Sequence, residues 1–157
     1  IALALPALDR MQFMFGSSLR EVAATVEREA GPGDVVVVAP DYIATTFNTY
    51  YHGPQAQIAF PWVMRRLEEI DCVGWNDAWY RAAEAVPATV DGIAERLAPG
   101  GRLWLVAALD DFPGDEEYYG QIRRLKAELD VRYVPQATLD TFRRTAEWAT
   151  IYVYGQR

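Results

Sequence analysis

The chain has 157 residues, the size of one ordinary domain with a single core. Its hydrophobic content of 51% and aromatic content of 13% exclude an intrinsically disordered segment. The 15 lysines and arginines are outnumbered by 22 aspartates and glutamates, which gives a net charge of −7. So acidic a chain lacks the basic surface of a nucleic-acid binder or of a protein that adheres to anionic lipids. We therefore expect no nucleic acid as a partner.

Cysteine and histidine each occur once, as Cys72 and His52. A single cysteine excludes an internal disulfide and a thiolate metal cluster, and a single histidine excludes a site built from two imidazoles. We expect no metal site, and we expect Cys72 to behave as a small buried hydrophobe.

The first eight residues, IALALPAL, are apolar but fall short of the roughly 18 residues that span a bilayer. No basic region precedes them, so they are not typical of a signal peptide. Two interpretations stay open: the end of an apolar segment, or the first residues of a trimmed domain. We assign residues 1–16 as an apolar connector, which in the first interpretation is the stump of a membrane helix, and 17–157 as one domain.

The first half of this domain predicts two helices and two strands. Residues 17–30 have the apolar spacing of an amphipathic helix, capped by Ser17 or Ser18, with Glu21 completing a capping box. The β-branched run at 35–39 predicts a strand buried on both faces, as in a parallel sheet covered by helices. A helix over 41–51 and a short strand at 57–60 are expected next.

The second half repeats this alternation. Helical spacing covers 79–97, with a restart at Pro87, and a second buried strand is expected at 102–108. A further helix follows an acidic loop and is marked by apolar residues at helical spacing: Tyr118, Ile122, Leu125 and Leu129. A short strand at 131–134 and an alternating strand at 149–154 close the chain.

This order predicts an α/β fold with three layers. The sheet is expected to be open and mostly parallel, Rossmann-like or flavodoxin-like, with helices on both faces and a C-terminal edge strand.

Three carboxylates follow the two predicted buried strands: Asp41 after the first, and Asp110 with Asp111 after the second. Loops at the carboxyl ends of parallel strands line the usual ligand crevice of such sheets, so these carboxylates could bind sugar hydroxyls or a hard divalent cation. The alternative is structural, because aspartate is also favoured in turns and at helix N-caps.

Aromatic residues gather around the same region, and we count Tyr42, Tyr50, Tyr51 and Trp62, with His52, as candidate ligand-binding residues. Aromatic rings stack on sugars, but they also fill cores and contact membrane interfaces. The sequence supplies neither the nucleophile nor the orienting acid that would make His52 a general base.

The sequence at 99–106, PGGRLWLV, resembles a segment of S-adenosylmethionine-dependent methyltransferases. In those enzymes an earlier glycine-rich loop holds the cofactor. Here the first strong strand is followed by Pro40 and Asp41, with no glycine for a close approach of the backbone. This absence argues against a methyltransferase, a dinucleotide-binding site and a P-loop.

A second resemblance covers residues 17–154. It is carried by SLREVA at 18–23, GDVVVVAP-x-Y at 33–42 and F-x-x-YY-x-G at 47–53, together with PGGRLWLV at 99–106 and the closing IYVY at 151–154. In this order and spacing the motifs resemble the extracytoplasmic C-terminal part of family-39-type membrane glycosyltransferases, which are related to protein O-mannosyltransferases and the lipid A aminoarabinose transferase.

The resemblance implies a parent enzyme in the cell membrane that transfers a sugar from a polyprenyl-phosphate donor, with this domain on the extracytoplasmic side. It implies two kinds of partner, the transmembrane portion of the same parent chain and a glycan or protein acceptor. The catalytic carboxylates of that family lie in a loop near the first membrane helices, and neither Asp41, Asp110 nor Asp111 matches them. The implied role is accessory, binding acceptor or docking, with no catalytic residue and no cofactor in this domain.

Two alternatives remain. One is a free-standing small-ligand-binding or interaction module of flavodoxin-like shape that binds at the carboxyl ends of its strands. The other is a divergent S-adenosylmethionine-binding protein.

Overall fold

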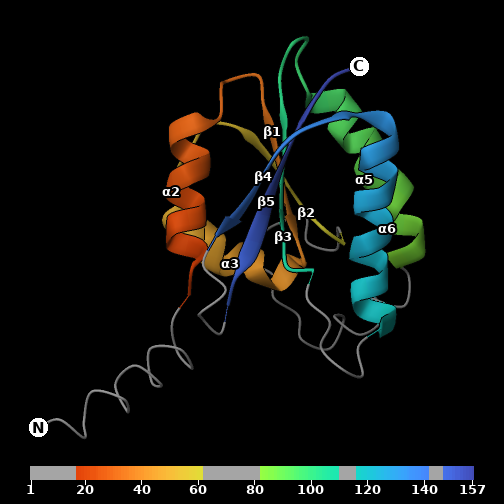
Figure 1. The fold of residues 1–157 in the computed structure, drawn as a ribbon, viewed down its shortest axis with the longest axis horizontal. Helices are drawn as coiled ribbons and strands as arrows, with labels where there is room; N and C mark the ends of the chain where they lie inside the picture. Colours follow the sequence, from red (N-terminus) through yellow and green to blue (C-terminus); the bar gives the residue numbers. More distant parts are fainter. Residues whose placement is uncertain (1–16, 62–81, 110–115, 142–146) are drawn as a thin grey trace, which may run out of the picture.

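The computed structural model describes residues 17–61, 82–109, 116–141 and 147–157, which form four helices around one five-stranded sheet (Figure 1). In chain order the elements are α2 (Leu19–Glu29), β1 (Val35–Ala39), α3 (Asp41–Tyr50), β2 (Ala56–Ala59), α5 (Ala82–Arg96), β3 (Leu103–Ala107), α6 (Glu116–Arg132), β4 (Val134–Thr141) and β5 (Ala149–Gly155). The predicted alternation of helices and strands is confirmed.

The sheet has the strand order β2-β1-β3-β5-β4. Strand β1 pairs in parallel with β2 and β3, with Val35 opposite Ala56 on one side and Leu103 on the other. Strand β5 runs antiparallel to both β3 and β4, so β4 has the direction of the first three strands. The prediction of an open, mostly parallel α/β sheet is confirmed.

Two hydrophobic cores lie on the two faces of the sheet. Helices α2 and α3 cover one face, where Val36, Val38, Trp104 and Val106 point. Helices α5 and α6 cover the other, where Val35, Val37, Leu103 and Leu105 point. Figure 1 shows the sheet between these two helix pairs. The continuous valine run in β1 is buried throughout because both of its faces are covered.

The expectation that the last strand forms the edge is wrong, because β5 lies inside the sheet and β4 takes the edge. The alternation of Tyr152 and Tyr154 with apolar residues suggested one solvent-facing side. Helix α6 covers that side instead: Lys126 Nζ lies 4.8 Å from the ring centroid of Tyr152, and the Tyr154 hydroxyl donates to Asp130 Oδ1 at 2.8 Å. Burial, followed by this hydrogen bond, raises the pKa of the Tyr154 phenol well above its ordinary range.

Other boundaries also differ from expectation. The segment expected as a strand at 131–134 belongs to the end of α6 and the first residue of β4. Helix α5 continues through Pro87 rather than restarting there. Within the described ranges, none of the helices combines the length and apolar character needed to cross a membrane.

The capping box predicted at Ser18 does not form. Ser18 is the N-cap of α2, but its side chain makes no cap hydrogen bond and its Oγ donates instead to the carbonyl of Glu147, at 3.3 Å. The Ser18 backbone N–H also donates to this carbonyl, at 2.9 Å. These contacts tie the start of the domain to the segment before β5, a connection that local sequence could not predict.

Candidate functional site

The carboxyl ends of β1, β2 and β3 meet at one edge of the sheet because these strands are parallel. The chain leaves β1 through a cis Ala39–Pro40 bond into α3 and leaves β2 through a cis Phe60–Pro61 bond. Pairing continues past the strands: the Phe60 N–H donates to Val38 O at 2.8 Å, and the Ala108 N–H donates to Ala39 O at 2.9 Å. We call this side of the sheet the carboxyl edge.

Asp41 lies at the carboxyl edge with only 2% of its surface exposed. It is the first residue of α3, whereas Pro40 is the N-cap and no side chain caps the helix. The alternative in which Asp41 acts as the helix N-cap is therefore wrong. A carboxylate in the first turn is still favoured by the positive end of the helix dipole.

Two tyrosine hydroxyls meet at this edge. Tyr42 on α3 and Tyr119 on α6 lie 3.3 Å apart, oxygen to oxygen, so they link helices from opposite faces of the sheet. Tyr42 is 37% exposed and Tyr119 is 5% exposed, so the pair has one accessible and one buried member. The carboxyl edge therefore holds the buried Asp41 carboxylate and a pair of phenol oxygens that can donate or accept.

Tyr119 was not among the predicted site residues. The sequence predicted an apolar helix face with Tyr118, Ile122, Leu125 and Leu129. Ile122, Leu125 and Leu129 are buried, as is Tyr119, whereas the side chain of Tyr118 lies outside the described part of the chain. Tyr119 is three residues before Ile122, which is itself a helical spacing, so the signal was present in the sequence.

The structure separates the predicted ligand-binding residues into two groups. Asp41 and Tyr42 begin α3, whereas Tyr50, Tyr51 and His52 lie at its other end. A helix of ten residues is about 15 Å long, so the second group lies at the opposite, amino edge of the sheet. Trp62, Asp110 and Asp111 lie outside the described residues, as does Cys72.

The second group makes contacts within the fold. The Arg20 guanidinium lies 5.0 Å from the ring centroid of Tyr50, and the His52 backbone N–H donates to Glu27 Oε1 at 2.5 Å. Tyr51 is buried, and its ring stacks on Phe47 with centroids 4.9 Å apart.

The Tyr51 hydroxyl donates to Gln55 Oε1. Burial, with smaller contributions from the carboxylates of Glu27 and Asp34, raises the pKa of this phenol to about 12. Tyr51 therefore belongs to the polar interior of the amino edge.

Asp34, which precedes β1, is the centre of that polar interior. Its buried carboxylate accepts from the Gly31 N–H at 2.9 Å, from the Arg102 N–H at 2.8 Å and from Trp104 Nε1 at 2.7 Å. Arg102 Nε lies 3.4 Å from the same carboxylate, and its guanidinium stacks 4.8 Å from the Trp104 ring centroid. Asp34 thus fixes the chain before β1 to the first residues of the β3 segment.

Gln55 continues this network, since its Nε2 donates to the carbonyls of Ala30 at 2.9 Å and Gly31 at 3.3 Å. The Pro-Gly-Gly turn at 99–101 has a structural role beside it, because a Cβ on Gly101 would collide with the carbonyl of Gly33. Sequence reasoning missed Asp34 and Gln55, whose partners include residues distant in the sequence.

A metal site would need several ligating side chains close together. Over the ranges that the structure describes, no three His, Cys, Asp or Glu side chains gather as a metal site would require. At the carboxyl edge, Tyr42 is an exposed side chain, whereas Asp41 and Tyr119 are buried.

The strand order and the helices on both faces of the sheet define the class of fold, an α/β domain with a Rossmann-like sheet. No family model matches the chain, and no curated protein matches it. Among solved structures, a Clostridium thermocellum protein assigned as an rRNA-methylase is similar over 91% of this chain and 99% of its own, with 11% identity and a TM-score of 0.43. A likeness of that degree transfers no function to this chain.

Proposed function

We propose that this domain is the non-catalytic, extracytoplasmic part of a membrane glycosyltransferase that uses a polyprenyl-phosphate sugar donor. We further propose that its carboxyl edge faces the membrane portion of the parent chain and an acceptor bound there. The proposal begins from the family-39-type resemblance of residues 17–154 and is supported by the direction in which the chain enters the fold.

The supporting observation is the position of Ser18. Its N–H and Oγ bond to Glu147, just before β5, and Thr150 near the start of β5 pairs with Ala107 at the carboxyl end of β3. The chain therefore enters the described fold at the carboxyl edge. Its last residues lie at the opposite edge, where Gln156 Nε2 donates to the Ala98 carbonyl at 2.5 Å (Figure 1). A preceding membrane segment would bring this edge nearest to the bilayer.

The chemistry of the carboxyl edge suits an acceptor better than it suits catalysis. The Tyr42 hydroxyl belongs to an exposed side chain and is a group that binds sugar hydroxyls or peptide amides, whereas Asp41 is buried. Neither is matched to a catalytic residue of the resembled family. Catalysis therefore belongs to the membrane portion of the parent enzyme, and this domain helps to hold the acceptor over it.

The test uses the two ends of α3 as a matched pair. In the full-length parent protein, with Cys72 and every other native cysteine replaced by alanine, Tyr42→Cys and His52→Cys each place a single thiol at the carboxyl or the amino edge, both at exposed positions. We expect a membrane-impermeant maleimide to label the cysteine at 52 readily and the cysteine at 42 at least about tenfold more slowly, because the docked portion excludes the reagent.

Equal labelling at both positions would contradict the docking of the carboxyl edge. The reading frame before Ile1 tests the parent itself: we expect several apolar segments of about 20 residues and paired acidic residues in the first extracytoplasmic loop. A start codon directly before Ile1, or sugar transfer by the purified 157 residues, would overturn the proposal.

One observation favours a second candidate, a free-standing small-ligand-binding module. The Tyr42–Tyr119 hydroxyl pair and buried Asp41 occupy the crevice position where open parallel sheets bind ligands. Calorimetric titration of the chain with nucleotides and S-adenosylmethionine separates the candidates. Saturable binding that Tyr42→Phe weakens, in a protein without membrane helices, would support the module.

A further inference from the structure

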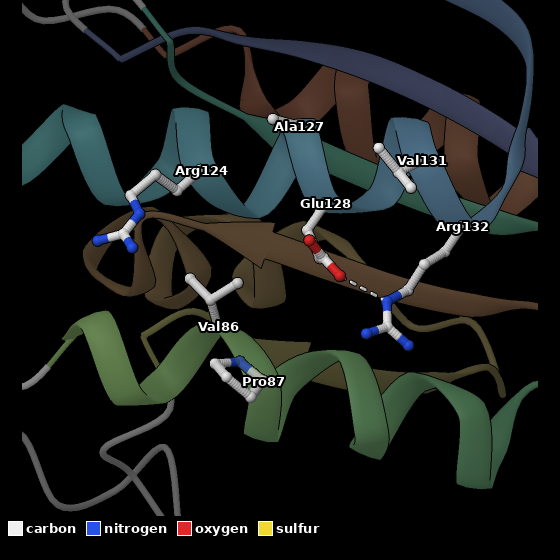
Figure 2. A pocket seen from close by; sticks show the side chains of 7 residues that line it. All are labelled: Val86, Pro87, Arg124, Ala127, Glu128, Val131 and Arg132. Atoms are coloured by element: carbon white, nitrogen blue, oxygen red, sulfur yellow. Dashed lines mark hydrogen bonds and ion pairs between the residues drawn. The ribbon is translucent and has the colours of Figure 1, made fainter.

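A hollow of about 430 Å³ opens between α5 and α6 (Figure 2). Val86 and Pro87 line it from α5. Ala127 and Val131 line it from α6, together with Arg124, Glu128 and Arg132. The walls are thus apolar residues bordered by charged ones.

The apolar part of this hollow is open to solvent. Val131 is 69% exposed, and Val134, three residues further along, is also exposed. Within the described part of the chain, only one other large hydrophobic side chain is exposed, Tyr42. Burial of the exposed Val131 side chain in the hollow would favour the binding of a partner.

The two arginines that line the hollow differ in their ion pairing. Arg132 Nε bonds Glu128 Oε1 at 2.7 Å, and this bond, with weaker attraction from Asp91, raises the pKa of Arg132. Arg124 is exposed and makes no hydrogen bond or ion pair with any residue that the structure describes. Figure 2 shows its guanidinium projecting from α6 toward the side of α5. With two arginines and one glutamate in its lining, the hollow carries one net positive charge in a chain of net charge −7.

We infer that the hollow between α5 and α6 docks an acidic amphipathic helix of a protein partner, with a carboxylate on Arg124 and apolar side chains on Val86, Ala127 and Val131. The positions of Arg124 and Val131 are seven residues apart on α6, about 10 Å along the axis. A docked helix spans this distance in two turns, so its carboxylate and one apolar residue lie at i and i+7 on the same face.

The test uses a fluorescein-labelled helical peptide with glutamates and leucines on one face at this spacing, titrated with the complete chain and followed by anisotropy. Arg124→Glu should weaken its binding about tenfold or more, because attraction becomes repulsion. Arg123→Glu makes the same charge change on the neighbouring residue, which does not line the hollow, and should change affinity less than about twofold.

Val131→Asp should weaken binding as well. Circular dichroism of each variant is the control for folding. A peptide with lysines in place of the glutamates should bind Arg124→Glu better than it binds the original chain. Equal affinities for Arg124→Glu and Arg123→Glu, or no binding at about 1 mM, would overturn the inference. Arg124-dependent binding to phosphatidylglycerol vesicles but not to the peptide would also overturn it, in favour of a lipid.

Discussion

The two edges of the sheet use polar residues in opposite ways. At the amino edge, the Asp34 carboxylate satisfies three donors from two parts of the chain, the Gly31 turn and the β3 segment, and the buried Tyr51 hydroxyl bonds Gln55. At the carboxyl edge, Asp41 sits at a helix start and Tyr42 exposes its ring beside a hydroxyl contact of 3.3 Å. The first arrangement buries all of these polar groups, whereas the second leaves the Tyr42 side chain exposed.

Burial and hydrogen bonding together distinguish polar residues that stabilise an open α/β sheet from polar residues that are available to a ligand. A buried polar network is worth most to stability when each member is satisfied, which is the condition of Asp34 and its partners. An exposed aromatic hydroxyl adds little stability, so its position has more freedom to serve recognition. Substitutions at the amino edge should therefore lower the free energy of unfolding more than substitutions at the carboxyl edge.

The largest effect is expected for Asp34→Ala. This change leaves the buried Trp104 indole N–H without its acceptor, removes the acceptor of two backbone N–H groups and unpairs Arg102. We expect a loss of about 3–5 kcal/mol in the free energy of unfolding, measured by urea denaturation. The exposed Asp91→Ala is the control and should cost less than about 0.5 kcal/mol. Similar losses for the two variants would refute the central role of Asp34.

The next effect is on alkaline stability and concerns Tyr51. In the unfolded chain this phenol ionises near its ordinary pKa of 10.0, whereas in the fold its pKa is about 12. Between these values the folded state holds a proton that the unfolded state has lost. The contribution of the Tyr51 phenol to the free energy of unfolding is therefore fully present below pH 10 and is lost as the pH rises toward 12.

Tyr51→Phe should make the alkaline loss shallower, while costing about 1 kcal/mol at neutral pH through the lost bond to Gln55. Urea midpoints measured across this pH range provide the test. Tyr154→Phe should remove a further part of the slope, because burial raises the pKa of that phenol too. An unchanged slope in both variants would show that neither phenol controls alkaline unfolding.

The sequence predicted the fold because its strongest signals are local. The valine run at 35–38 and the helical spacing of Leu19, Val22 and Val26 each specify an element and the face that it buries. Even the division of Asp41 from Tyr51 follows from local rules, since a crossover helix after a parallel strand must return to the other edge.

Other features depended on residues far apart in the chain. The interior position of β5 comes from its pairing with both β3 and β4, and Lys126 and Asp130 of α6 contact the tyrosines that looked solvent-facing. The bonds from Asp34 to Arg102 and Trp104 join residues 68 and 70 positions apart, a pairing that no single-sequence pattern encodes. The candidate site was therefore only partly predictable: Asp41 and Tyr42 follow β1 directly, whereas the contact between Tyr42 and Tyr119 joins residues 77 positions apart.

The smallest effect is expected at the carboxyl edge, and it is the sharpest test of the comparison. Tyr42→Phe and Tyr119→Phe each remove one oxygen of a 3.3 Å hydroxyl pair, and each should cost less than about 1 kcal/mol of stability. A double-mutant cycle measures the coupling between them, which we expect to be about 0.5 kcal/mol because Tyr42 is partly hydrated. A coupling as large as the Asp34→Ala loss would mean that the hydroxyl pair stabilises the fold as strongly as the Asp34 network does. A small coupling, with acceptor or ligand binding weakened by Tyr42→Phe, would mean that the hydroxyl serves recognition, since the fold does not need it.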